Sequence, residues 1–95
     1  MVAFAGSAQL QILNALANQN RLDILACLRS GKKNVTELME STRLSQSTVS
    51  HSLYRLSASG LISSVPQNRF RYYEISNPIV PVLLDILEKH PLTIA

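Results

Sequence analysis

The chain has 95 residues, 46% of them hydrophobic, with a formal net charge of +3 and a pI near 9.4. This length suits one domain, and the single cysteine excludes an intrachain disulfide. No apolar run approaches the roughly 20 residues of a membrane span, and no basic segment leads into a signal-peptide core, so we expect a cytoplasmic protein. The modest positive charge permits a polyanionic partner without requiring one.

Two helices are predicted in the first third of the chain. Residues 7–16 place apolar side chains on one helical face: Leu10, Ile12, Leu13 and Leu16. Residues 18–30 form the second helix, with Asn18 as its cap. Its core positions are Leu22, Ile24, Leu25 and Leu28. After it, Lys32 and Lys33 lie in a loop beside Gly31, where a solvated turn and contact with phosphate explain them equally well.

A short helix and a turn are predicted next. Thr36 is a plausible cap for a helix through residues 37–39, and residues 41–44 resemble a tight turn into Ser45. A further helix begins at Ser45, whose hydroxyl can accept a hydrogen bond from the amide of Ser47 or Thr48. Helix, turn and helix within about 25 residues are typical of a helix-turn-helix.

The helix after Ser45 has two different faces. Val49, Leu53 and Leu56 recur at the spacing of a buried face. The opposite face carries hydrogen-bonding side chains: Gln46, Ser47, Ser50, His51 and Arg55. Such a face can contact base edges and phosphates in a major groove, so the pattern predicts a DNA recognition helix.

A β-hairpin is predicted directly after this helix. Gly60 is a natural C-cap, residues 61–65 and 70–75 are rich in β-forming side chains, and residues 66–69 form a Pro/Asn turn between them. Tyr73 and Ile75 share one strand face and are expected to pack inward. A hairpin in this position is the wing of a winged helix.

The last predicted helix is apolar nearly all round. Pro78 opens it and Pro91 ends it. Its apolar residues are Ile79, Val80, Val82, Leu83, Leu84, Ile86 and Leu87. Because such a helix cannot have only one buried side, we expect the first and last helices to form a dimer interface, the alternative being a monomer that folds both over its own core. Only Met1–Gly6 and Leu92–Ala95 are expected to be loose.

Several motifs, in order and at consistent spacing, resemble the ArsR/SmtB family of winged-helix transcriptional repressors. They are residues 16–25 (LANQNRLDIL), 35–38 (VTEL), 44–53 (LSQSTVSHSL), 60–62 (GLI) and Tyr72-Tyr73, and the resemblance covers roughly residues 10–90. It implies a prokaryotic homodimer that leaves its operator when a metal, metalloid or redox signal alters it. We therefore predict a mainly α fold with a small β-hairpin (α+β), one winged helix-turn-helix DNA-binding domain over residues 1–95, ordered over about residues 7–90, dimerising through its N- and C-terminal helices.

The expected partner is double-stranded DNA with an imperfect inverted repeat, because a symmetric dimer places its two recognition helices in successive major grooves. Gln46, Ser47, Ser50 and His51 are assigned to base edges. Thr48 bonds a phosphate or reinforces the cap, and Arg43 and Arg55 contact the backbone. In the wing, the residues assigned to a minor groove or phosphate are Gln67, Asn68, Arg69 and Arg71. For Arg71, an edge-strand charge that discourages aggregation is an equal alternative, and Phe70 and Tyr72 are weaker candidates.

The sensing sites that the resemblance implies are missing. The segment at residues 37–41 holds no thiol where thiol-rich members carry a Cys-Val-Cys motif, and Asp85 is followed two residues on by Leu87 instead of the histidine of the zinc-sensing pair. Asp85, Glu88 and His90 remain as donors, but Asp85 and His90 lie about 140° apart around a helix, so no metal site or other cofactor is predicted. Cys27 is expected to be partly exposed and inert, since Asp23 one turn away disfavours a thiolate. The inducer is left open.

Two other classes of function were weighed against DNA binding. A winged helix can serve as a protein-interaction module without specific DNA readout, which is the alternative to the regulator. An enzyme is not predicted, because His51 has a serine one turn away at Ser47 but no carboxylate placed to orient it, and no phosphate-binding loop occurs. The sequence predicts a homodimeric DNA-binding transcriptional regulator, a repressor by resemblance.

Overall fold

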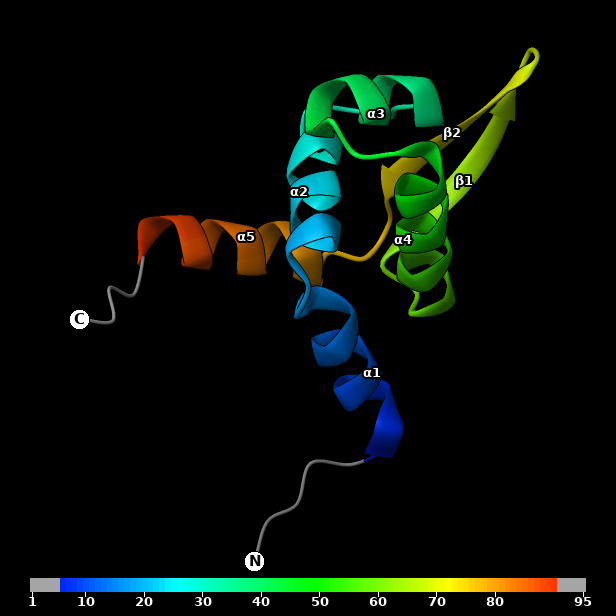
Figure 1. The fold of residues 1–95 in the computed structure, drawn as a ribbon. Helices are drawn as coiled ribbons and strands as arrows, with labels where there is room; N and C mark the ends of the chain where they lie inside the picture. The colour runs from blue at the N-terminus through cyan, green and yellow to red at the C-terminus, as the bar shows by residue number, and fades with distance from the viewer. Residues whose placement is uncertain (1–5, 91–95) are drawn as a thin grey trace, which may run out of the picture.

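The computed structural model describes residues 6–90 (Figure 1). Its elements are α1 (Gly6–Leu16), α2 (Gln19–Leu28), α3 (Val35–Thr42), α4 (Gln46–Ala58), β1 (Ile62–Gln67), β2 (Phe70–Ile75) and α5 (Ile79–Lys89). Helices α2, α3 and α4 surround the core, the hairpin projects beside α4, and α1 and α5 extend away from the body in different directions (Figure 1). Helix α1 already includes Gly6, and the other residues expected to be loose lie outside the described part.

The core is built mainly from one face each of α2 and α4. The fully or nearly buried apolar residues are Ala15, Ile24, Leu25, Leu28, Leu38, Val49, Leu53, Leu56, Leu61, Ile62, Val80 and Leu84. The predicted faces of both helices are confirmed, except that Leu22 is only partly buried. Tyr73 and Ile75 pack against this cluster from β2, as expected. The core therefore holds the recognition helix by its apolar side and leaves its polar side outward.

The start of α3 differs from the prediction. Its N-cap is Asn34, whose side chain accepts a hydrogen bond of 2.9 Å from the Glu37 amide, while the Glu37 carboxylate accepts one of 3.0 Å from the Asn34 amide. This reciprocal capping box satisfies two amide groups that otherwise lack partners. The expectation that Thr36 caps the helix is wrong, because Thr36 already lies in the first turn.

The turn into α4 is also shorter than expected. Helix α3 continues to Thr42 and ends at Arg43, which adopts the left-handed conformation (φ 62°) and donates its amide to the Met39 carbonyl at 2.8 Å. The turn thus occupies residues 43–45 and not 41–44. Ser45 caps α4 as predicted, with its hydroxyl accepting from the Thr48 amide at 3.2 Å.

The exit from α4 is a Schellman motif. The C-cap is Ser59, one residue before the predicted Gly60, and Gly60 is the left-handed residue after it (φ 75°). The Gly60 amide donates to Ser57 O at 3.0 Å and the Leu61 amide to Leu56 O at 3.1 Å. Glycine suits this φ because it has no Cβ, and the reversal leads the chain into β1.

The hairpin has a longer first strand and a tighter turn than predicted, and β2 covers residues 70–75 as predicted. Residues 62–67 pair antiparallel with residues 70–75, from Ile62 opposite Ile75 to Gln67 opposite Phe70. Pro66 is therefore a strand residue opposite Arg71, and only Asn68 (φ 59°) and Arg69 form the turn. Asparagine tolerates this positive φ, which two-residue hairpin loops require.

The loop after α2 is attached to the wing. Lys33 and Tyr73 exchange backbone hydrogen bonds of 3.1 and 2.8 Å, forming a bridge on the free side of β2. The Lys32 ammonium donates to Gln67 Oε1 at 2.6 Å and lies 5.6 Å from the centre of the Tyr72 ring. The expectation of a solvated turn is therefore incomplete, since this loop joins the helical body to the hairpin.

The terminal helices present uncovered apolar side chains. Leu10 and Leu13 of α1 are 59% and 58% exposed. In α5, which follows Pro78 as predicted, Val80 and Leu84 are buried while the exposed apolar residues are Ile79, Val82, Ile86 and Leu87. The end of α5 at Lys89 is described, but Pro91 is not. No helix within residues 6–90 has the length and apolar character needed to cross a bilayer.

Candidate nucleic-acid interface

The outward side of α4 is a continuous polar stripe. Each of the side chains predicted to face DNA is exposed: Gln46, Ser47, Ser50, His51 and Arg55. Val49, Leu53 and Leu56 on the opposite side are at most 2% exposed, so the helix cannot rotate without breaking the core. The arrangement presents amide, hydroxyl, imidazole and guanidinium groups at successive turns, which are the groups that bond base edges and phosphates.

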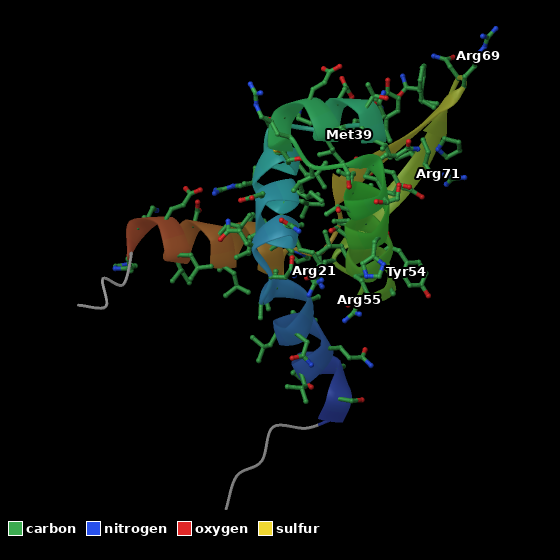
Figure 2. The ribbon with its side chains drawn as sticks, in the orientation of Figure 1. Arg21, Met39, Tyr54, Arg55, Arg69 and Arg71 are labelled. Carbon is green, nitrogen blue, oxygen red and sulfur yellow. The ribbon has the colours of Figure 1, made fainter. Side chains whose placement is uncertain are left out.

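Tyr54 is a member of this stripe that the sequence prediction missed. It is 70% exposed and lies one turn after Ser50 on the outer side of α4, beside Arg55 (Figure 2). The sequence prediction assigned no role to Tyr54. The helical spacing from Ser50 was the signal that could have identified it.

Thr48 takes part in the cap of α4, which is one of its two predicted roles. It is half-buried, and its hydroxyl receives a hydrogen bond of 2.9 Å from Ser45 Oγ. The same Ser45 oxygen accepts from the Thr48 amide and lies 3.3 Å from Ser47 Oγ. The start of α4 is thus a small hydroxyl cluster that fixes the first turn of the helix.

A groove separates the start of α2 from α4. Its lining consists of Asn18, Asn20, Arg21, Ser47, Thr48, His51 and Ser52. Ser52 is only 4% exposed, and sequence reasoning gave it no role. The groove borders the polar stripe, since Ser47 and His51 belong to both.

Arg21 stands at the lower end of this groove. Its Nε donates to Ala15 O at 2.6 Å and its Nη2 to Asn14 O at 3.0 Å, which satisfies carbonyls at the end of α1. Burial and the neighbouring charge of Arg55 lower the pKa of Arg21, though a guanidinium remains charged. Figure 2 shows the two arginines extending from α2 and α4 toward the same region.

The predicted wing residues lie along the projecting hairpin. Gln67, Asn68, Arg69 and Arg71 are all exposed, and Arg69 is at the tip (Figure 2). Arg71 donates to Ser64 Oγ at 2.9 Å across the strands, and Gln67 accepts from Lys32. Arg69 forms no side-chain hydrogen bond with another residue of the described chain, so its guanidinium is available to a partner. Arg43 is likewise exposed, at the turn before α4.

The carboxylates considered as metal donors are engaged by an arginine. Arg29 at the end of α2 bonds Asp85 Oδ1 at 2.5 Å and Glu88 Oε1 at 3.0 Å, which ties α5 to the body. These carboxylates raise the pKa of Arg29, chiefly through the hydrogen bond that Arg29 donates to Asp85. Within residues 6–90 no three potential metal ligands gather. Cys27 is partly buried against the core, so the expected partial exposure is confirmed.

Helix-turn-helix, exposed recognition helix and hairpin together define a winged helix-turn-helix DNA-binding domain. Residues 18–64 match the family described as bacterial regulatory protein, arsR family. The transcriptional activator HlyU of Vibrio cholerae is 32% identical over 78 residues, covering 82% of this chain and 72% of HlyU. The chain belongs to the ArsR/SmtB family of transcriptional regulators.

Other comparisons agree with this assignment. The putative arsenical resistance operon repressor ArsR2 of Halobacterium salinarum is 33% identical over 86 residues, covering 88% of this chain and 71% of that protein. The structure of reduced HlyU superposes with a TM-score of 0.81 at 29% identity over 90% of each chain. The homodimeric winged helix-turn-helix domain Mb0332 of Mycobacterium bovis has a TM-score of 0.73 at 26% identity, over 97% of this chain and 100% of the domain.

Proposed function

We propose that this chain is a homodimeric, sequence-specific regulator in which two copies of α4 enter successive major grooves of an imperfect inverted repeat. The exposed polar stripe of α4, held by a fully packed opposite face, carries this proposal. Gln46, Ser47, Ser50 and His51 contact base edges, and Arg43 and Arg55 contact the phosphate backbone. Tyr54 joins them as a hydrogen-bond donor to phosphate, and Thr48 acts through the cap.

The wing supplies contacts outside the major groove. Arg69 at the tip reaches phosphate or the adjacent minor groove, where an arginine adds affinity with little sequence information. Gln67, Asn68 and Arg71 lie beside it on the same hairpin. Because Lys32 and Lys33 attach this hairpin to the body, the wing and α4 approach DNA in a fixed relation.

Dimerisation is supported by the uncovered apolar faces of α1 and α5. Six large apolar residues on these two helices are between 39% and 59% exposed: Leu10, Leu13, Ile79, Val82, Ile86 and Leu87. Exposed apolar surface of this extent marks an interaction site. A second copy is the occupant we propose, and the homodimer of Mb0332 provides a precedent on the same fold.

We assign the protein to repression of transcription in the cytoplasm, where bacterial DNA lies. An activator is equally compatible with the DNA contacts, since the relatives include one named as an activator and one named as a repressor. No signal that releases the DNA follows from the described residues.

The test is a fluorescence-anisotropy titration of the purified protein against its own upstream region and a scrambled duplex, at several salt concentrations. Binding to the native duplex at least about a thousandfold tighter than to the scramble supports specific regulation. Weak, equal and steeply salt-dependent binding to both duplexes means that the upstream region lacks the operator. Selection from a random duplex pool then decides whether the protein prefers any sequence. The absence of binding at low salt to every duplex points to a protein-interaction module.

A further inference from the structure

The groove between α2 and α4 is lined by residues with polar or positively charged side chains and has no acidic residue in its lining. Its lining residues supply amide, hydroxyl, imidazole and guanidinium groups, and none of them is a carboxylate. Hydrogen-bond donors of this kind, without a competing anion, suit a phosphate group. The groove also lies along the flank of the helix that enters the major groove, where the sugar–phosphate backbone passes.

A buried hydroxyl opens into this groove without a partner. Ser52 is 4% exposed, and its side chain makes no hydrogen bond with any residue in the described part of the chain. Ser52 lines the groove. In the described residues every fully buried side-chain oxygen has a hydrogen-bond partner, so the unpartnered Ser52 oxygen must be accessible from the groove. The Ser52 hydroxyl is therefore free to donate to an acceptor that enters the groove.

Two arginines of like charge lie near each other, Arg21 in the lining of the groove and Arg55 outside it. Arg21 and Arg55 approach from α2 and α4, and the charge of Arg55 acts on Arg21 (Figure 2). The ion pairs found within residues 6–90 all belong to Arg29, so neither Arg21 nor Arg55 is paired with a carboxylate of that region. An anion held between α2 and α4 would offset the repulsion between them.

We propose that the α2–α4 groove binds a backbone phosphate of the DNA, with Ser52 and Asn20 as hydrogen-bond donors and Arg21 and Arg55 as the neighbouring positive charges. The proposal rests on the proposed DNA-binding function and adds to it residues from α2, outside the helix-turn-helix and the wing. One phosphate in each groove would clamp the flank of α4 at a fixed depth. Ser52 and Asn20 are positioning residues that act on all sequences alike.

Two isosteric or smaller substitutions test this without disturbing the core. Ser52→Ala removes only a hydroxyl that has no protein partner, so the melting temperature is expected to stay unchanged. Asn20→Asp places a carboxylate in the groove. Matched controls are Ser41→Ala for the lost hydroxyl and Ser41→Asp for the added carboxylate, because Ser41 is exposed on α3 and does not line the groove.

Binding is measured to two duplexes. One is the duplex that the protein selects from a random pool, and the other is a scrambled version of it. Asn20→Asp is expected to weaken binding to both duplexes by about tenfold or more, and Ser52→Ala by a smaller equal factor on both. The salt dependence should flatten by about two units of slope for the dimer when one phosphate contact per protomer is lost. The two controls should keep the affinity and slope of the unchanged protein.

Neutral methylphosphonate groups placed singly along the selected duplex locate the phosphate. The unchanged protein should lose affinity at one position in each half-site, and Ser52→Ala should lose less affinity at that same position because one of its donors is already absent. Equal sensitivity of both proteins at every position, or unchanged affinity and slope for both variants, would overturn the proposal while leaving DNA binding intact. If the pool yields no selected duplex, the proposed function itself fails, which is a separate result.

A free anion is the competing source of phosphate, and amide NMR distinguishes it. If millimolar inorganic phosphate saturably shifts the Asn20 and Ser52 signals while both variants bind DNA normally, the groove serves a free anion and the DNA assignment is wrong. If phosphate shifts these signals and DNA displaces it, the groove and the DNA backbone share one site, as proposed.

Discussion

The dimer interface gives a prediction whose magnitude follows from exposure. Leu87 on α5 is 56% exposed in the single chain. Replacing it with alanine removes three carbon atoms, each contributing about 0.8 kcal/mol when fully buried, so about half of that total, roughly 1.3 kcal/mol, depends on the partner. Both copies change in a symmetric dimer, and Leu87→Ala should therefore weaken dimerisation by roughly 2.5 kcal/mol, close to a hundredfold in Kd.

Sedimentation equilibrium over a range of protein concentrations measures this Kd, with circular dichroism to confirm that each protomer remains folded. Phe70→Ala is the matched control, because Phe70 is 54% exposed on the wing, away from α1 and α5. A Kd for Leu87→Ala within about threefold of the unchanged protein would refute the assignment of α5 to the interface. Equal weakening by Phe70→Ala would show that any exposed apolar residue produces the effect.

Three further predictions concern DNA binding and folding. Ser50→Ala or His51→Ala should reduce discrimination between operator and random duplex by about 1–3 kcal/mol per lost base contact, and equal losses on both duplexes would exclude direct readout. Arg69→Ala should weaken both duplexes similarly and flatten the salt dependence by nearly one unit of slope per lost contact; a change confined to the operator would contradict a phosphate contact. Asn34→Ala should lower the free energy of unfolding in urea by about 1–2 kcal/mol through loss of the capping box, whereas Thr36→Ala should change it by less than about 0.5 kcal/mol, and the reverse order would show that the cap is misassigned.

Local patterns in the sequence predicted most of the fold and the outward face of α4. The apolar spacing of Val49, Leu53 and Leu56 and the cap at Ser45 are short-range signals, and both are confirmed. The cap of α3 was available in the same way, because Asn34 and Glu37 have the spacing of a capping box. The prediction of Thr36 as the cap rests on its residue type alone and does not consider the two hydrogen bonds that Asn34 and Glu37 can exchange.

Contacts between distant parts of the chain could not be predicted from such patterns. Arg29 reaches carboxylates 56 and 59 residues away, and the partner of Lys33 lies 40 residues further along the chain. The groove beside α4 depends on how α2 packs against α4, so the position of Ser52 relative to Asn20 has no local signature. These features come from tertiary packing. The periodicity of apolar residues predicts which face of a helix is buried, but it does not predict which element packs against that face.

The proline in β1 has a consequence for the solubility of the protein. A projecting two-stranded hairpin offers two free strand edges, and an exposed edge can pair with a strand of another molecule. Pro66 has no amide hydrogen to donate along the outer edge of β1, and the Lys33 bridge occupies part of the outer edge of β2. Both edges are thus interrupted, so molecules crowded together along DNA are protected from polymerising wing to wing.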